Sequence, residues 1–148
     1  MATNVFINLP VSDLARSKAF YTSFGWTLNP DFSNDDAGAV AISDTIFLMI
    51  LTHQHWAQFT DKPVADAHAT SAVINAISVD APEDVDALVG RAVAAGAVEG
   101  RSQELGFMRS RSFADPDGHT WEVMWMDPIA QTGDWEAVGA KYGDQQPA

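Results

Sequence analysis

The stretch Phe107–Met126, FMRSRSFADPDGHTWEVMWM, decides the fold of this chain. Two apolar-rich runs flank Asp115-Pro116-Asp117-Gly118, in which proline fixes φ, aspartate bonds its own backbone and glycine accepts a positive φ. The sequence therefore predicts a β-hairpin whose loop consists of these four residues.

A loop of four residues also sets the register of the hairpin. It places Arg111 opposite Glu122, and His119 opposite Ala114 on the other face, where we expect the imidazole to pack against a helix. Opposed residues share one face of a sheet. We expect the face of Glu122 to carry eight side chains, namely Phe107, Arg109, Arg111, Phe113, Thr120, Glu122, Met124 and Met126.

Glu122 is a carboxylate inside an apolar run, where an unpaired buried charge is costly. Two interpretations remain open. Glu122 forms a structural ion pair with Arg111, or it is a general base or metal ligand in a cavity where Arg109 and Arg111 hold an anionic ligand.

The composition narrows the class of protein. The 148 residues are 47% hydrophobic and contain no cysteine, so a packed core is available but a disulfide or a Cys-based zinc site is not. A net charge of −12 disfavours nucleic acid and anionic lipid as partners. The first residues, MATNVFINLP, lack a basic and apolar leader, and no apolar run is long enough to span a bilayer. We expect a single soluble, cytoplasmic domain.

The order of the expected elements repeats. A strand, a capped helix and three further strands read as β-α-β-β-β over about residues 3–52, and the same order returns over about 71–127. Residues 53–70 form a connector with a short helix, and 128–148 form a tail whose isolated aromatic residues pack on the surface or on a neighbouring subunit.

The repeat is also visible in the residues. Phe6–Val11 aligns with Ile74–Val79, and Asp44–Met49 aligns with Asp117–Glu122. Such self-similarity indicates duplicated modules. The fold class is therefore α+β, with two β-α-β-β-β modules.

Two motifs carry a resemblance to a known family. VSDLARSKAFY, at Val11–Tyr21, and DPDGHTWEV, at Asp115–Val123, resemble the vicinal oxygen chelate superfamily, which includes glyoxalase I, bleomycin-resistance proteins and ring-cleaving dioxygenases. The resemblance covers about residues 3–127. It implies two modules packed into a cup, often in a homodimer, with a ligand or a divalent metal inside.

The resemblance also implies four metal-ligand positions, which fall on Phe6, Met49, Ile74 and Glu122. Phenylalanine and isoleucine cannot coordinate a metal, and methionine is a soft ligand. We therefore expect no cofactor and no metal. A divalent metal would need Glu122 together with His53 or His55, which share a face if they end a strand.

The leading hypothesis is a protein of this superfamily whose cup binds a small, partly apolar molecule, with an acidic group of that ligand meeting an arginine. The expected ligand-binding residues are Phe6, Asn8, Met49, Arg109, Arg111, Phe113 and Met124. The alternative is a glyoxalase-like lyase or isomerase with Glu122 as its catalytic base, and a dioxygenase fits less well because the pair of histidines is missing. A third reading is a homodimer with a collapsed cup and an interaction role for the tail.

Overall fold

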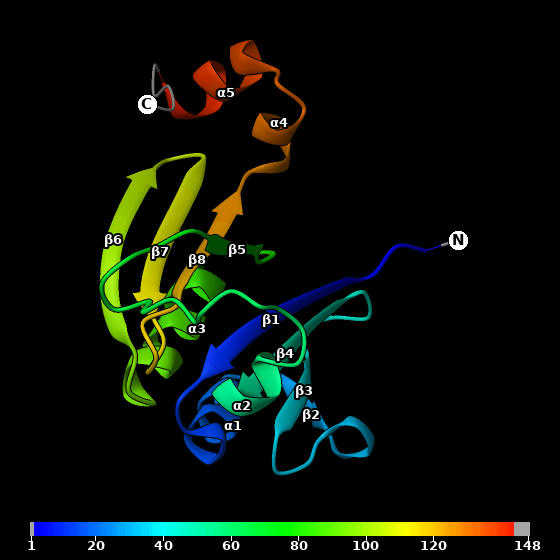
Figure 1. Cartoon of the computed structure of the whole chain (residues 1–148). Helices are drawn as coiled ribbons and strands as arrows, with labels where there is room; N and C mark the ends of the chain where they lie inside the picture. Colours follow the sequence, from blue (N-terminus) through cyan, green and yellow to red (C-terminus); the bar gives the residue numbers. More distant parts are fainter. Residues whose placement is uncertain (1, 144–148) are drawn as a thin grey trace. The chain divides into compact units, whose positions relative to one another are not determined.

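The computed structural model describes residues 2–143 and contains two four-stranded sheets with helices, which confirms the α+β class (Figure 1). The chain divides into two compact units. The first unit holds the described residues up to Ala72 together with Asp115–His119, and the second holds Val73–Ala114 together with the described residues from Thr120 onward. No helix within residues 2–143 is long and apolar enough to cross a membrane.

The first unit contains the sheet β1-β4-β3-β2, in which β1 runs parallel to β4 and the other neighbours are antiparallel. Pro30 follows β2 and opens a short 3-10 helix. The elements are β1 Val5–Val11, α1 Leu14–Thr22, β2 Thr27–Asn29, η1 Pro30–Phe32, β3 Ala37–Ala41, β4 Ile46–Thr52 and α2 His53–Trp56.

Alternation along β4 gives this sheet two different faces. Leu48 and Ile50 are fully buried, and helix α1 packs on β3 and β4. Asp13 caps α1 by accepting a hydrogen bond from the backbone N–H of Arg16. The opposite face of the sheet carries Phe47 and Met49, which are only half-buried.

The second unit repeats this design with the sheet β5-β8-β7-β6 and helix α3. Pro82 occupies the first turn of α3, and Glu83 and Asp84 follow it where they complement the helix dipole. The elements are β5 Ile74–Ser78, α3 Pro82–Ala94, β6 Val98–Leu105, β7 Met108–Ala114, β8 Thr120–Met126, α4 Pro128–Gln131 and α5 Trp135–Tyr142.

The strand registers confirm the alignment of the two repeats. In the first unit Asn8 pairs with Met49, and Phe6 pairs with Phe47. In the second unit Ala76 pairs with Glu122, and Ile74 pairs with Thr120. Met49 and Glu122 therefore occupy equivalent positions of the two modules.

The predicted register of the hairpin is wrong by one residue. The loop has five residues, because the N–H of Asp115 donates to the carbonyl of His119 at 2.9 Å and Ala114 pairs with Thr120. Glu122 consequently lies opposite Ser112, and Arg111 lies opposite Val123. A slip of one residue exchanges the faces of a strand, so Arg109, Arg111 and Phe113 lie on the face away from Glu122.

The tail is helical where the structure describes it. Helices α4 and α5 pack on Phe107 and Met108, with Ala130 and Val138 completing a small buried cluster. The ring centroids of Phe107 and Trp135 lie 5.6 Å apart in an edge-on contact. Residues 144–148 of the predicted tail lie outside the described residues.

Candidate functional site

A large apolar pocket lies in the first unit, on the sheet face that α1 leaves open. Its volume is about 660 Å³, a size typical of small-molecule sites. It brings together three of the predicted ligand-binding residues, Phe6, Asn8 and Met49. The remaining lining residues come from the same sheet and from the short helices and loops beside it: Asn4, Asn29, Phe32, Ala39, Val40, Ala41, Phe47, Leu51, His55 and Phe59.

Aromatic rings form much of this apolar pocket. The rings of Phe6 and Phe47 are stacked, with centroids 5.2 Å apart and planes inclined by 18°. Phe6, Phe32 and Phe59 are 58%, 70% and 69% exposed, which is unusual for such large apolar side chains. When a ligand or a partner covers apolar surface of this kind, the surface leaves water and the free energy falls.

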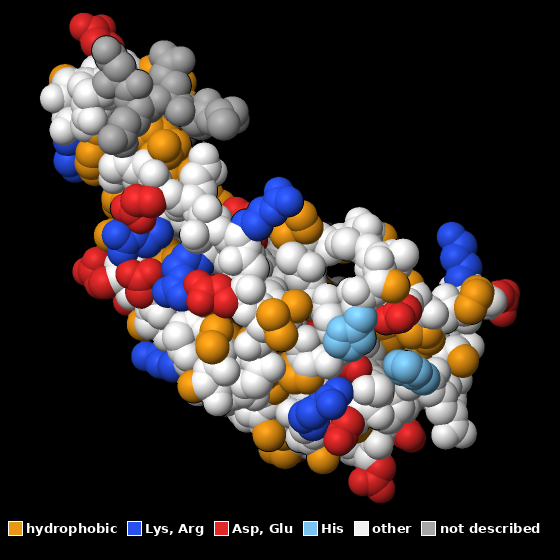
Figure 2. Space-filling view, turned by 90° about the vertical axis from the view of Figure 1, so that its left-hand side faces the viewer, with side chains coloured by type: hydrophobic (Ala, Val, Ile, Leu, Met, Phe, Trp, Pro, Cys, Tyr) orange, Lys and Arg blue, Asp and Glu red, His pale blue; other side chains and the backbone are white. Residues whose placement is uncertain are grey.

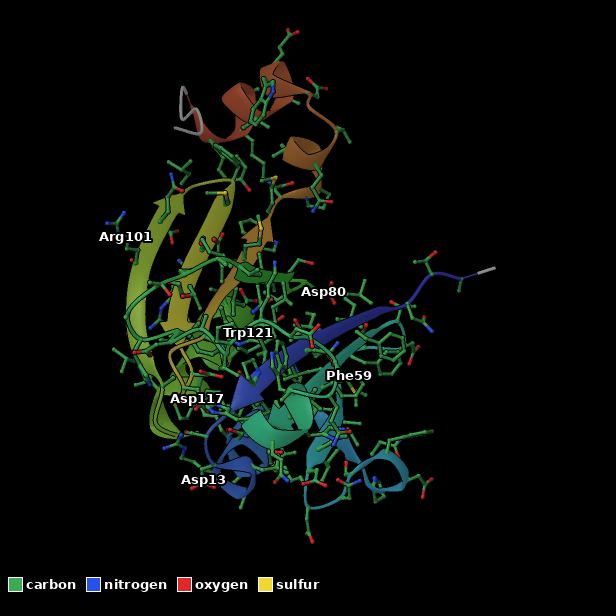
Figure 3. The ribbon with its side chains drawn as sticks, in the orientation of Figure 1. Asp13, Phe59, Asp80, Arg101, Asp117 and Trp121 are labelled. Carbon is green, nitrogen blue, oxygen red and sulfur yellow. The ribbon has the colours of Figure 1, made fainter. Side chains whose placement is uncertain are left out.

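The second unit has a separate, polar groove of about 680 Å³. Glu122 lines it and accepts a hydrogen bond from the hydroxyl of Ser110 at 3.1 Å, not from Arg111. Met124 lies on the same face and packs against the cluster around Phe107. Arg101 also lines the groove, although Figure 3 shows its side chain projecting away from β6. The other lining residues are Ile74, Gly100, Ser102, Gln103, Ser112 and Thr120.

The ion pair expected between Arg111 and Glu122 is absent from the described contacts, because both arginines of β7 have other partners. Arg111 bonds Glu99 at 2.5 Å and Asp86 at 3.1 Å. Arg109 bonds the same Asp86 at 2.7 Å and Glu104 at 2.5 Å. The pKa of each guanidinium is raised, chiefly by hydrogen bonds to these glutamates.

This network ties α3 to the edge of the sheet. Figure 2 views the molecule from the side on which β6 lies in Figure 1, and there basic and acidic side chains alternate on the surface. Phe113 is 1% exposed and belongs to the core beneath α3. The three residues that were expected to line the cup beside Glu122 therefore lie on the other face of the sheet, where Arg109 and Arg111 are ion-paired and Phe113 is buried.

The histidine pair is also placed differently from the prediction. His53 and His55 lie on the first turn of α2 and not on a strand end, so they point in different directions. His55 lines the apolar pocket, and its ring meets the ring of Phe59 edge-on at 5.2 Å. His53 instead lines a smaller pocket of about 320 Å³, together with His68 and His119.

His119 bonds strand β1, whereas the bond was expected to go to a helix. It ends the loop Asp115–His119, which belongs to the first unit, and its Nε2 bonds the carbonyl oxygen of Pro10 at 2.7 Å. Asp117 of the same loop, labelled in Figure 3, accepts hydrogen bonds from the backbone N–H and the hydroxyl of Ser12 at 2.9 and 2.7 Å. The motif DPDGH thus anchors the loop to the start of α1.

Asp115 is the buried member of this loop. Its side chain accepts hydrogen bonds from the hydroxyl of Tyr21 and from the backbone N–H groups of Asp117 and His119. Burial raises the pKa of Asp115, and the bond from Tyr21 opposes that rise. The sequence identified this stretch as a turn, but the pairing of Tyr21 with Asp115 has no local signal because the two residues are far apart in the chain.

The side chains at the four positions that the resemblance assigns to metal ligands do not fit a divalent metal. Phe6, Met49 and Ile74 supply neither imidazole nor carboxylate, which leaves Glu122 as one oxygen donor. Among residues 2–143, no group of three or more His, Asp or Glu side chains is placed to hold a metal ion.

Solved structures share this fold. A hypothetical protein from S. aureus has 22% sequence identity and a TM-score of 0.69, covering 84% of this chain and 94% of its own. A glyoxalase-related enzyme from Fulvimarina pelagi has 27% identity and a TM-score of 0.68, covering 84% and 88%. A mutant of the fosfomycin resistance protein FosX from Listeria monocytogenes, complexed with Mn(II) and 1S,2S-dihydroxypropylphosphonic acid, has 19% identity and a TM-score of 0.67, covering 91% and 99%.

No curated protein matches this chain in the sequence comparison. The family model of the glyoxalase/bleomycin resistance protein/dioxygenase superfamily matches residues 5–123, which is most of the chain. Together with the two repeated modules and the DPDGH loop, this match identifies the chain as a member of the glyoxalase/bleomycin resistance protein/dioxygenase superfamily.

Proposed function

We propose that this protein binds a small, partly apolar molecule in the apolar pocket of its first unit and does so without the metal of its relatives. The observation that carries the proposal is the set of exposed aromatic side chains that line one pocket. Phe6, Phe32 and Phe59 are each more than half exposed, and all of them line one pocket of about 660 Å³. Covering them removes apolar surface from water, which is the main source of affinity for such ligands.

No metal is proposed because of the side chains at the expected metal-ligand positions. Phe6 and Ile74 stand where the relatives' ligands are expected, and their side chains cannot donate electron pairs to a metal. A sequestering role, like that of a bleomycin-resistance protein, needs only a pocket of suitable chemistry.

The uncharged fluorescent probe N-phenyl-1-naphthylamine tests the pocket, because its emission rises when it leaves water. We expect saturable binding by the unmodified protein. Phe6→Thr should weaken that binding at least about tenfold, since a large exposed apolar contact is lost.

Val98→Thr is the matched control, because Val98 is a strand residue of the second unit that is 71% exposed. It should leave the affinity for the probe unchanged. Equal weakening by Phe6→Thr and Val98→Thr, or no saturable binding by the unmodified protein, would contradict the proposal.

A second candidate is a lyase or isomerase of the glyoxalase type. Glu122 favours it, because this half-buried carboxylate lies in the polar groove within reach of the Ser110 hydroxyl. In that position it could remove a proton next to a substrate carbonyl, which is general base catalysis.

Deuterium uptake from D2O into a panel of small α-hydroxyketones, followed by proton NMR, tests this candidate. Exchange that disappears in Glu122→Gln and persists in Ser110→Ala would support a base role for Glu122. Exchange no faster than in buffer would leave the binding proposal standing alone.

We also propose a homodimer. Apolar side chains of the second unit support it, since Val73 and Ile74 are 64% and 61% exposed. Sedimentation equilibrium should show a dimer at micromolar concentration, and a monomer throughout that range would overturn this part of the proposal.

A further inference from the structure

The polar side chains of the apolar pocket, like its aromatic rings, indicate which kind of ligand it takes. None of the described residues that line it is Asp, Glu, Lys or Arg, although the whole chain carries a net charge of −12. A ligand with a formal charge would leave water at this face without a counter-charge to meet it, and that transfer is costly. Apart from the imidazole of His55, the lining therefore offers no side chain that would meet an ion of either sign, and it favours uncharged ligands.

The rings favour a flat ligand. Phe6 and Phe47 already form a stacked pair, and the 58% exposure of Phe6 leaves surface on which a further ring can pack. Aromatic pairs prefer offset-stacked or edge-on arrangements and gain free energy beyond their buried area. A saturated ring system of the same size would fill the volume but would not gain that additional free energy.

Carboxamides supply the hydrogen bonds. Asn8 donates one Nδ2 hydrogen to the carbonyl of Phe6 at 3.2 Å, which leaves its second N–H group and its side-chain oxygen for a ligand. Asn4 and Asn29 line the same pocket. A neutral ligand hydroxyl or N–H group can pair with these carboxamides, which both donate and accept.

We infer that the ligand is an uncharged, planar aromatic molecule that carries a hydroxyl or N–H donor. The inference rests on the proposed function, because it names the class of molecule that the apolar pocket takes. It also replaces the expected acidic ligand, since Arg109 and Arg111 are held by Asp86, Glu99 and Glu104.

Three probes of one size separate ring, charge and volume. 2-Naphthol is planar and uncharged at neutral pH, decahydro-2-naphthol has the same carbon skeleton without aromatic rings, and 2-naphthoate keeps the rings but is an anion. Their dissociation constants are measured by NMR titration of the full chain. We expect 2-naphthol to bind about tenfold more tightly than either of the others.

Phe6→Leu keeps an apolar side chain but removes the stacked ring. It should bring the affinities for 2-naphthol and decahydro-2-naphthol within about twofold of each other, while N-phenyl-1-naphthylamine still binds at a measurable level. Val98→Leu, in the second unit, should preserve the tenfold preference.

The outcomes distinguish this inference from the proposed function. If N-phenyl-1-naphthylamine binds but 2-naphthol and its saturated analogue bind equally, the pocket is simply apolar and the inference is wrong. If 2-naphthoate binds best, the pocket prefers an anion and the inference is equally wrong. If no probe binds, the proposed function itself fails.

Discussion

Asp115 is a buried carboxylate whose charge depends on its hydrogen-bond donors. Burial raises its pKa from the ordinary value of 3.8, and the hydroxyl of Tyr21 is the largest influence in the opposite direction. The bond joins helix α1 to the DPDGH loop, so the protonation of Asp115 is linked to the stability of the first unit.

Tyr21→Phe removes this donor and keeps the stacking of the ring on Trp26. We expect a loss of about 1–3 kcal/mol in the free energy of unfolding at pH 7, because a buried carboxylate oxygen loses its partner. The pKa of Asp115 then rises further. A raised carboxyl pKa costs stability above the folded value, and that cost vanishes as the pH falls below the ordinary value of 3.8.

The loss should therefore be smaller near pH 3 than at pH 7. Denaturant unfolding of both proteins at the two pH values measures the difference. An equal loss at both would mean that the bond contributes nothing to the charge state of Asp115.

Gly118 and Gly25 have nearly the same positive φ, so a comparison of the two separates backbone strain from crowding by neighbouring atoms. Gly118 has a φ of +91° and Gly25 a φ of +95°. A Cβ on Gly118 would approach the backbone of Ala67 and His68 to 2.7 Å, whereas nothing lies within 4 Å of the corresponding position on Gly25.

Gly25→Ala should cost about 1–2 kcal/mol from the left-handed conformation alone. Gly118→Ala should cost more than that, because the loop must also move away from the backbone of residues 67–68. Thermal unfolding of the two variants gives the comparison, and equal destabilisation would show that the loop yields without cost.

At the scale of elements, the hairpin shows what the sequence could and could not predict. The turn and both strands were predicted, but the assumption of a four-residue loop displaced the register. A signal for the correct register was present, since this register puts the three large apolar residues Phe113, Trp121 and Val123 on one face. The same register leaves Ser110, Ser112 and Glu122 together on the polar face.

The C-terminal helices are held by one carboxylate. Asp127 caps α4 by accepting a bond from the N–H of Ile129, and its other oxygen accepts bonds from Lys141 at 2.7 Å and Tyr142 at 2.5 Å, both in α5. These bonds, first that from Lys141, lower the pKa of Asp127 to about 2. Two short helices that could not persist alone are thereby fastened to the end of β8.

Asp127→Asn keeps the cap oxygen but replaces the acceptor for Lys141 with an amide donor. We expect the variant to unfold more easily at pH 7 and α5 to exchange its amide hydrogens faster. A lowered carboxyl pKa stabilises above the ordinary value of 3.8 and loses that effect as the pH falls through about 2.

The difference between Asp127→Asn and the unmodified protein should therefore close between about pH 4 and pH 2. Hydrogen exchange followed by mass spectrometry measures it. A difference that persists at pH 2 would indicate that packing, and not the ion pair, holds α5.

At the scale of the whole molecule, the proposed absence of a metal can be checked by the metal content of the purified protein. Protein purified without a histidine tag should contain no stoichiometric metal by elemental analysis. Titration of the unmodified protein with Ni, Zn, Mn or Fe(II) should show no stoichiometric binding that depends on Glu122. The variant Glu122→Ala should therefore give the same titration. Stoichiometric metal that depends on Glu122 would instead make a lyase or an oxygenase the working model.

The architecture of each module was predictable because local sequence patterns determine it and because these patterns occur twice. Helix caps, turn residues and alternation give each module, and the aligned repeats give the equivalence of Met49 and Glu122. The partners of Arg109 and Arg111 were not predictable in this way. They depend on Asp86, Glu99 and Glu104 meeting β7 through tertiary packing, and a sequence pattern does not encode such meetings.

The DPDGH loop makes the two modules interdependent in time as well as in structure. Asp115–His119 completes the first unit but is encoded between two strands of the second. On the ribosome, the amino-terminal module would emerge long before Asp117 and His119, the side chains that close it. The residues up to Ala72, translated alone, would therefore lack the loop that completes their unit.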